Sequence, residues 1–331
     1  MRATNLISTI RSLVEKKVPS FLWGAPGIGK SSIVKQVALG ENIGFIDLRL
    51  ALMDPTDLKG IPFYDKDTHT AQWAPPAFLP TKGEGILFLD ELNSAPPSVQ
   101  ASAYQLILDR KVGEYELPEG WAIVAAGNRE SDRGVTYRMP APLANRFVHL
   151  EMEVSIEDWR LWAFERELDE SIISYISYKN EHLFTFDAKS DAKSFATPRS
   201  WEYVNSVIQS SLSDDLYLDT ISGAVSRDVA VSYLSFAKVQ NRLPNIDDIL
   251  KTSQGEYSED VDVLYALSAG LVSAFLKDRS SEYLDNLLKY TLELKSEFAV
   301  MVVQDLQRAG IDMQRSEAFK EWVRKFAYLL G

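Results

Sequence analysis

A short stretch near the beginning of the chain combines the residue types that bind phosphate. It reads WGAPGIGKSS over residues 23–32, and residues 24–31 match the pattern G-x-x-x-x-G-K-[ST] in full. Glycines in this pattern let backbone amides turn inward around phosphate oxygens. Lys30 is expected to reach the β- and γ-phosphates of a nucleotide, and Ser31 to place its hydroxyl on Mg²⁺. The residues expected to line the nucleotide are Gly24, Ala25, Pro26, Gly27, Ile28, Gly29, Lys30, Ser31 and Ser32.

Paired carboxylates follow an apolar run further along the chain, in the segment ILFLDELN of residues 86–93. Beside a phosphate-binding loop, Asp90 would hold magnesium through water and Glu91 would polarise the attacking water. The alternative is two solvated acids that end a strand. We favour the first interpretation because a buried strand ending in paired carboxylates places metal and base beside the phosphates. Asn93 is close enough in sequence to hydrogen-bond Glu91, and it is equally suited to a turn.

A third polar residue, Asn128, ends the apolar run VAAGN of residues 124–128. An amide at the tip of this strand would lie between the strand that carries the loop and the strand that carries the metal acid. There it would orient the attacking water toward the γ-phosphate. Asn is common in strand-to-loop turns, so this interpretation depends on the loop and the acids.

The elements that must position these residues form an alternating pattern up to about residue 150. Short apolar runs alternate with amphipathic helical stretches, which predicts an α/β fold with a mainly parallel sheet flanked by helices. The predicted strands are 20–23, 44–48, 85–89 and 121–126. One helix is predicted at the N-terminus and another after residue 96, with the apolar faces Leu6, Ile10, Leu13 and Val14, and Val99, Ala103, Leu106 and Ile107.

The second half of the chain has a different pattern. Ser155 precedes Asp158 by three residues at the head of a Trp- and Leu-rich stripe, which indicates a capped helix start. From there onward the sequence is almost wholly helical in pattern. We therefore expect a nucleotide-binding core at residues 1–150, a helical lid at 151–250 and a helical C-terminal extension at 251–331.

Composition narrows the possible functions. The 331 residues include no cysteine and three histidines, which removes disulfides and thiolate zinc sites. A formal net charge of −12 disfavours binding to nucleic acid or an anionic membrane, since phosphate binding needs a surplus of Lys and Arg. No apolar run approaches the ~20 residues that span a bilayer. The N-terminal stretch is patterned as a helix and not as a signal peptide, so the expected location is cytoplasmic.

The motifs together resemble those of a known family. Residues 24–31, residues 86–91 and Asn128 are similar to the phosphate loop, metal-acid strand and first sensor of AAA+ ATPases. The segments DPTDLKGIP, LFLDELNSAPPSVQASAYQLILDRKVGEY and PLANRF resemble the MoxR-like, helix-2-insert branch of that family. The similarity runs from residue 20 to about residue 201. It implies a P-loop AAA+ core that binds ATP and Mg²⁺, followed by a helical lid.

The resemblance also implies roles for three arginines. Arg146, in PLANRF, matches an arginine finger that acts on the nucleotide of a neighbouring subunit, and Arg199, in TPRSW, matches a second sensor that touches the γ-phosphate. Arg138 lies near the finger and is a second possible contact across the interface. Each has an alternative: Arg146, for example, could cap a helix or pair with an acid.

Two segments fall where the MoxR-like branch inserts β-hairpins. They are residues 55–78 and residues 111–121, and by resemblance they face a pore or a protein client. The aromatic residues of the first segment could equally belong to the core; they are Phe63, Tyr64, Trp73 and Phe78.

The function implied by the resemblance is ATP hydrolysis that drives chaperone-like remodelling or maturation of a protein client. The implied assembly is a hexameric ring, and the implied partner is a protein with a von Willebrand factor A domain. Two alternatives stay open: a DNA-stimulated nucleic-acid motor, against which the acidic composition weighs, and a slow nucleotide switch that holds a partner. Glu91 and Arg146 weigh against the switch.

Overall fold

The computed structural model describes residues 1–132, 137 and 139–329, which form two compact units. The first consists of Met1–Val154 with Asp187–Asp191, and the second of Ser155–Phe186 with the residues from Ala192 onward. We call them the α/β unit and the helical unit. The expected boundary at residue 250 falls within helix α11, Ile246–Thr252, and a separate C-terminal extension stays a prediction.

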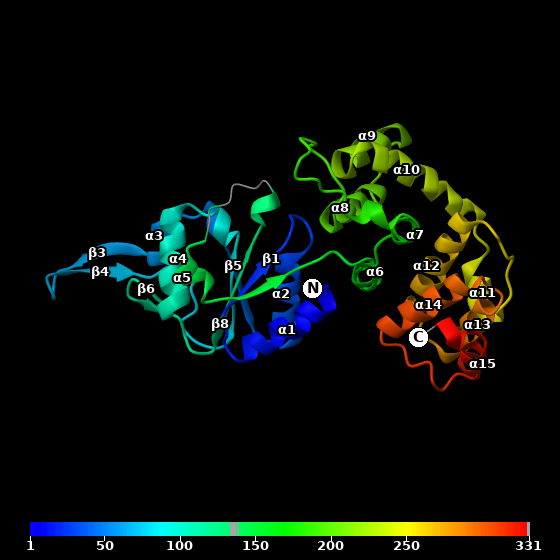
Figure 1. The fold of residues 1–331 in the computed structure, drawn as a ribbon, viewed down its shortest axis with the longest axis horizontal. Helices are drawn as coiled ribbons and strands as arrows, with labels where there is room; N and C mark the ends of the chain where they lie inside the picture. The colour runs from blue at the N-terminus through cyan, green and yellow to red at the C-terminus, as the bar shows by residue number, and fades with distance from the viewer. Residues whose placement is uncertain (133–136, 138, 330–331) are drawn as a thin grey trace. The chain divides into compact units, whose positions relative to one another are not determined.

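The α/β unit is built around a five-stranded, wholly parallel sheet (Figure 1). The strand order is β2-β5-β8-β1-β9. Their bounds are Gly44–Arg49, Gly85–Asp90, Trp121–Gly127, Ser20–Trp23 and Val148–Glu151. The parallel α/β fold and the four predicted strands are confirmed. The edge strand β9 was missed because only one of its four residues is buried, so it lacks the continuous apolar runs of β1, β5 and β8.

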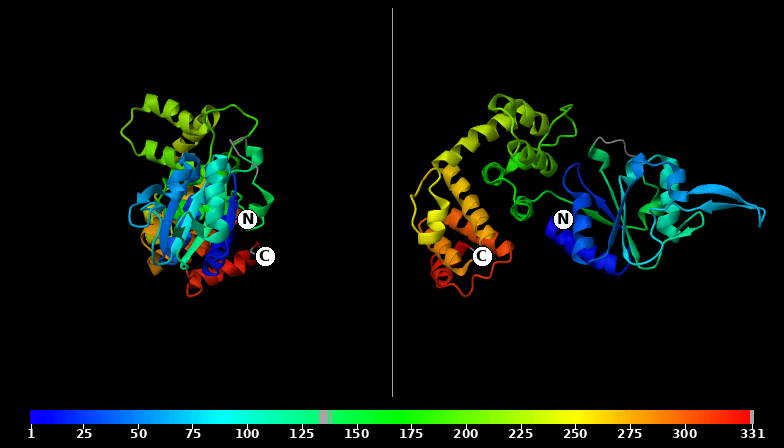
Figure 2. Two further views of the ribbon diagram at one scale, coloured as in Figure 1. Left: turned by 90° about the vertical axis from the view of Figure 1, so that its left-hand side faces the viewer. Right: turned by 180° about the vertical axis from the view of Figure 1, so that it is seen from behind.

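Helices cover both faces of this sheet (Figures 1 and 2). Helices α1, Ala3–Glu15, and α2, Lys30–Gly40, lie on one face, and α4, Pro97–Asp109, lies on the other. Leu6, Ile10 and Val14 of α1 are buried as predicted, while Leu13 is only partly so. All four residues predicted for the apolar face of α4 are buried.

Two small hairpins extend from the α/β unit in the segments where they were expected. One is formed by β3, Ile61–Asp65, and β4, Thr70–Ala74, after the short helix α3, Pro55–Lys59. It projects away from the sheet (Figures 1 and 2). The other is formed by β6, Lys111–Val112, and β7, Tyr115–Glu116.

The aromatic residues of the first hairpin segment do not form a core in this chain. Phe63 is 47% exposed, Tyr64 61% and Phe78 43%, and Trp73 is half-buried. The core interpretation of Phe63, Tyr64 and Phe78 is therefore wrong for the chain by itself.

The helical unit begins with the predicted capped helix. Ser155 accepts a hydrogen bond from the Asp158 amide at 3.3 Å and caps α6, Ile156–Glu165. The following helices are α7 Glu170–Tyr178, α8 Pro198–Ile208, α9 Asp214–Val225, α10 Arg227–Ala237, α11, α12 Val261–Lys277, α13 Ser281–Thr291, α14 Ser296–Arg308 and α15 Glu317–Phe326. None of the helices in the described part of the chain is both long and apolar enough to cross a bilayer.

Candidate nucleotide site

The phosphate-binding loop joins β1 to α2, between Trp23 and Lys30. Gly27 and Gly29 have φ angles of 77° and 97°, a conformation that other residues adopt only with strain. Gly29 is the N-cap of α2 and provides no side-chain cap, so the first amides of the helix are left for another acceptor. A helix N-terminus of this kind is a ready anion site, because its amides and its dipole both favour negative charge.

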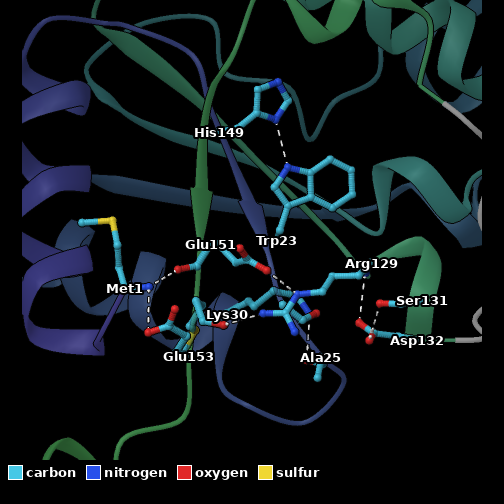
Figure 3. A network of polar contacts seen from close by, with 12 residues as sticks. Met1, Trp23, Ala25, Lys30, Arg129, Ser131, Asp132, His149, Glu151 and Glu153 are labelled. Atoms are coloured by element: carbon cyan, nitrogen blue, oxygen red, sulfur yellow. Dashed lines mark hydrogen bonds and ion pairs between the residues drawn. The ribbon is translucent and has the colours of Figure 1, made fainter.

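Lys30 ties this loop to the end of a neighbouring strand. Its ammonium donates hydrogen bonds to the carbonyls of Gly24 at 2.6 Å and Ala25 at 3.1 Å, and to Asn128 Oδ1 at 3.0 Å. Figure 3 shows Lys30 directed into the loop toward Ala25. The lysine predicted for the phosphates and the amide predicted for the attacking water are thus in direct contact.

The acids Asp90 and Glu91 lie at the same carboxyl edge of the sheet. Leu87 and Leu89 of β5 belong to the core under α4, so by strand alternation Asp90 points to the face that α2 covers. Glu91 has a φ of 56°, in the left-handed region, which costs a residue with a β-carbon roughly 1 kcal/mol. This turn ends the strand and directs the chain away from it. The Glu91 amide donates to Asp90 Oδ1 at 2.9 Å.

Asn93 connects the acid turn to Asn128, a role that the sequence did not reveal. Its side chain is 2% exposed and donates from Nδ2 to the Asn128 carbonyl at 2.8 Å. The expected contact with Glu91 is not formed. A β-carbon on Gly127 would lie 2.1 Å from Asn93 Oδ1, so only glycine leaves room for this amide. The glycine that precedes Asn128 was the available signal.

Arg129 fixes the segment that follows Asn128. Its Nε lies 2.7 Å from Glu151 Oε1 at the end of β9, and its amide donates to Asp132 Oδ2 at 3.0 Å (Figure 3). Because both charged side chains are partly exposed, the ion pair contributes under about 1 kcal/mol. Its effect is to hold the ends of β8 and β9 on either side of the phosphate loop.

The carboxyl edge carries a concentration of negative charge. The pKa of Asp47, on β2, is raised mainly by partial burial and further by the charges of Asp90 and Glu91, while Arg49 and Lys35 act in the opposite direction. Asp47 was missed in the sequence because it lies inside β2 and not at the end of a strand, where the predicted site residues lie. Acids that repel one another at one edge are the setting in which a divalent cation binds well.

The residues present fit a magnesium nucleotide. Ser31 in the first turn of α2 and Asp90 at the end of β5 lie on the same side of the sheet, and both offer oxygen ligands that Mg²⁺ prefers. Among the described residues, no group of three or more His, Cys, Asp or Glu could hold a metal alone.

Arg146 lies at the opposite edge of the sheet. In the parallel pairing of β1 and β9, Val148 is level with Ser20, so Arg146 and Gly24 are separated by about six residues, or roughly 20 Å of strand. Arg146 is exposed, and within the described residues its side chain neither caps a helix nor pairs with an acid. It cannot reach a nucleotide in the loop of its own chain.

Arg199 belongs to the helical unit, in the first turn of α8. Thr197 caps this helix by accepting a hydrogen bond from the Ser200 amide at 3.1 Å, and Arg199 is exposed. Its charge, with that of Arg166, opposes the burial that raises the pKa of Glu202. Arg138 lies outside the described residues.

A glycine-rich loop between a central parallel strand and a helix, with acids and an amide at the adjacent strand ends, defines a nucleotide-binding α/β unit of the phosphate-loop class. Residues 20–149 match the ATPase family associated with various cellular activities (AAA). The similarity to that family covers this part of the chain, which is less than half of its length.

Two curated proteins, MoxR and midasin, are similar to parts of this chain. MoxR of Paracoccus denitrificans is 30% identical over 148 residues, which are 41% of this chain and 40% of MoxR. Midasin of Giardia intestinalis is 28% identical over 177 residues, 50% of this chain and 4% of midasin. The chain thus spans less than half the length of these relatives. Among solved structures, NtrX of Brucella abortus in complex with ADP is similar over 98% of this chain and 68% of NtrX, at 14% identity and a TM-score of 0.43.

Proposed function

We propose that this chain hydrolyses ATP with Mg²⁺. The single observation that supports this best is the junction at Lys30, which bonds both to its own loop and to Asn128. Lys30 and the loop amides would hold the phosphates, and Ser31 and Asp90 would hold the ion. Magnesium supplies charge neutralisation at the β- and γ-phosphates when bound.

The remaining predicted residues would have separate roles in hydrolysis. The Glu91 carboxylate would accept a proton from the attacking water, and Asn128 would orient that water. Arg146, which lies too far from its own loop, would act on a nucleotide held by a second copy and stabilise the charge of the transferring phosphoryl group. Arg199 would report the γ-phosphate to the helical unit. The active form is accordingly an assembly, and we propose a hexameric ring.

We further propose that hydrolysis drives chaperone-like remodelling of a protein client in the cytoplasm. The β3–β4 hairpin supports this, since it exposes Ile61, Phe63 and Tyr64 to solvent. Contiguous exposed apolar residues mark interaction sites. The relationship to MoxR suggests a client or partner that contains a von Willebrand factor A domain.

Steady-state ATP turnover with Mg²⁺ and with EDTA tests the enzymatic part. Glu91→Gln removes the base with little change of shape, so turnover should fall by about 10²- to 10⁴-fold while ATP binding persists. Glu84→Gln, which removes one acid from the loop before β5, is the matched control and should turn over ATP like the parent. Turnover of Glu91→Gln at the parent rate would place the base elsewhere.

The client is tested separately with the same trapped protein. Glu91→Gln with ATP should retain a client from lysate, and adding Phe63→Ser and Tyr64→Ser should release it without affecting ATP binding. Tyr203→Ser, at an aromatic residue of the helical unit that is 56% exposed, is the control. Retention of DNA in place of protein, or DNA-stimulated turnover, would replace this proposal with a nucleic-acid motor.

A further inference from the structure

A hollow at the amino edge of the sheet is lined by basic side chains from three separate segments. Its volume is about 260 Å³. Lys17 precedes β1, Arg110 is the C-cap of α4, and Arg146 precedes β9. The rest of the wall is apolar and consists of Pro19, Ile107, Leu108 and Ile123. We call these seven residues the basic hollow.

The positive charge of the basic hollow is not neutralised within the described part of the chain. Among described residues, Lys17 and Arg110 donate hydrogen bonds only to backbone carbonyls of the turn before β8 and of its first residue, Trp121, at 2.7–2.8 Å. The Arg146 side chain has no hydrogen bond or ion pair with a described residue. In a chain with a net charge of −12, three basic side chains around one hollow without a carboxylate make a local site for an anion.

A structural role can explain Arg110 or Lys17 separately, but it does not explain why three basic residues meet at one hollow. A cation at the end of a helix stabilises that helix, which would explain Arg110. Anchoring the turn before β8 would explain Lys17. Neither role explains why Arg146, from a third segment, converges on the same hollow, or why the hollow has apolar walls.

The geometry points to a phosphate pocket that acts between two copies of the chain: Lys17 and Arg110, together with Arg146, contact the phosphates of a nucleotide held by the loop of a second copy. This rests on the proposed function, which makes Arg146 the residue that crosses the interface. A hollow of about 260 Å³ exceeds the ~30 Å³ of a water several-fold and admits a phosphate group. Its apolar walls strengthen the attraction of the guanidinium groups for phosphate oxygens.

The test measures association between copies, so it does not depend on turnover. Glu91→Gln protein is sedimented with ATP, with ADP and without nucleotide. Adding Arg110→Ala or Lys17→Ala should weaken the ATP-dependent association about ten- to a hundredfold, because each loses a charge-assisted hydrogen bond, and should leave ATP binding unchanged. Lys111→Ala and Lys16→Ala remove the same charge from adjacent, exposed residues and should associate like the parent.

A second variant covers the case in which Arg110→Ala disturbs the turn that it anchors. Leu108 is 37% exposed in the wall of the hollow, so Leu108→Glu adds an anion there without removing any hydrogen bond. It should weaken ATP-dependent association as strongly as Arg110→Ala, and Leu108→Gln should have little effect. Parent-like association of Leu108→Glu, or no ATP-dependent association of the parent, would overturn the pocket.

The source of the phosphate is tested with Lys30→Ala, which keeps the basic hollow and removes the lysine of the loop. It should not bind inorganic tripolyphosphate measurably. Saturable binding that Arg110→Ala abolishes would mean a site for free anions and would overturn the assignment to a second copy's nucleotide. If the parent binds ATP and associates in this charge-dependent manner but never turns ATP over, hydrolysis fails while the pocket stands.

Discussion

The two edges of the central sheet differ in the charged side chains that they carry and in the partners of those side chains. At the carboxyl edge, Lys30 is surrounded by carbonyl and amide oxygens, and partial burial together with the charges of Asp90 and Glu91 raises the pKa of Asp47. At the amino edge, Lys17, Arg110 and Arg146 line one hollow and no described carboxylate pairs with them. One edge is organised around a junction of hydrogen bonds, and the other exposes positive charge.

Under the proposed function, this difference means that one copy of the chain does not contain the complete catalytic site. At the edge that would hold the nucleotide, the described arginines Arg49 and Arg129 lie beside Asp47 and Glu151. The edge that carries Arg146 has no phosphate loop. A head-to-tail contact would bring the carboxyl edge of one copy to the amino edge of the next. Contacts of this kind close into rings when the rotation allows it.

The largest effect is expected from Arg146→Ala. An arginine supplied across an interface contributes about 10³- to 10⁵-fold to turnover, so the variant should lose that factor while its own loop still binds ATP. Mixing it with Lys30→Ala should restore part of the activity, because the second variant keeps an intact Arg146 for the loop of the first. Turnover of the mixture is measured against each variant alone. A mixture that stays as inactive as its components would place Arg146 outside the site.

Lys30→Ala probes the other edge. The substitution removes a charge that is held at the centre of the loop, and ATP affinity should fall by at least about a hundredfold, as for loss of strong charge-assisted hydrogen bonds. Isothermal titration with Mg²⁺ and ATP measures it, and Lys16→Ala, at an exposed residue paired with Glu15, is the control. Unchanged affinity would remove the phosphate-loop assignment altogether.

A smaller effect is expected at Asn93, which links the acid turn to Asn128. Asn93→Asp keeps the shape but cannot donate to the Asn128 carbonyl, so turnover should fall about ten- to a hundredfold with little change in ATP affinity. Gly127→Ala should do the same by displacing Asn93, given the 2.1 Å approach. Asn42→Asp makes the same chemical change in an exposed turn and is the matched control, which should turn over ATP like the parent.

The two substitutions at this contact also test each other. If Gly127→Ala acts by pushing Asn93 aside, combining it with Asn93→Ala should cost much less than the sum of the two single effects, since neighbours that share one contact are not additive. Fully additive losses in turnover would mean that Gly127→Ala acts for another reason, such as the approach of the added β-carbon to within 2.8 Å of the Phe21 ring.

The sequence predicted the parts of this site that local chemistry determines. The phosphate loop is contiguous, and its glycines, lysine and hydroxyl are needed at fixed spacing whatever surrounds them. The three central strands β1, β5 and β8 were recognisable because their apolar runs are nearly continuous, as expected for strands covered on both faces. Even the position of Asn128 followed, because parallel strands deliver their last residues to one edge.

What the sequence could not show depends on contacts between distant segments. Asn93 reads as a turn residue, and only the close packing of Gly127 against it reveals the bond to the Asn128 carbonyl. Lys17 and Arg110 read as ordinary surface charges in their own segments, and their meeting with Arg146 follows from the register of the sheet and the length of α4. Contacts between such distant residues produce no periodicity or fixed residue spacing in the sequence, so they could not be predicted from it.

The smallest expected effect concerns Asp47 and the charge of the carboxyl edge. Because its pKa is raised in the folded chain, the unfolded chain releases this proton first, and ionisation of Asp47 costs stability as the pH rises from about 4 through the raised pKa. Asp47→Asn abolishes that cost. The melting temperature of the variant minus that of the parent should therefore be larger at neutral pH than at pH 4. Since much of the Asp47 side chain stays exposed, water limits the gain to under about 1 kcal/mol.

Thermal melts between pH 4 and 8 measure this, with Asp67→Asn in the exposed β3–β4 turn as the control. If the difference in melting temperature between Asp47→Asn and the parent is constant across that range, the charges of Asp90 and Glu91 do not affect the pKa of Asp47. The crowding of acids would then be absent in solution, and the contrast between the two edges would rest on the basic hollow alone. A pH-dependent separation that Mg²⁺ with ATP reduces would instead show that the bound ion neutralises the same field.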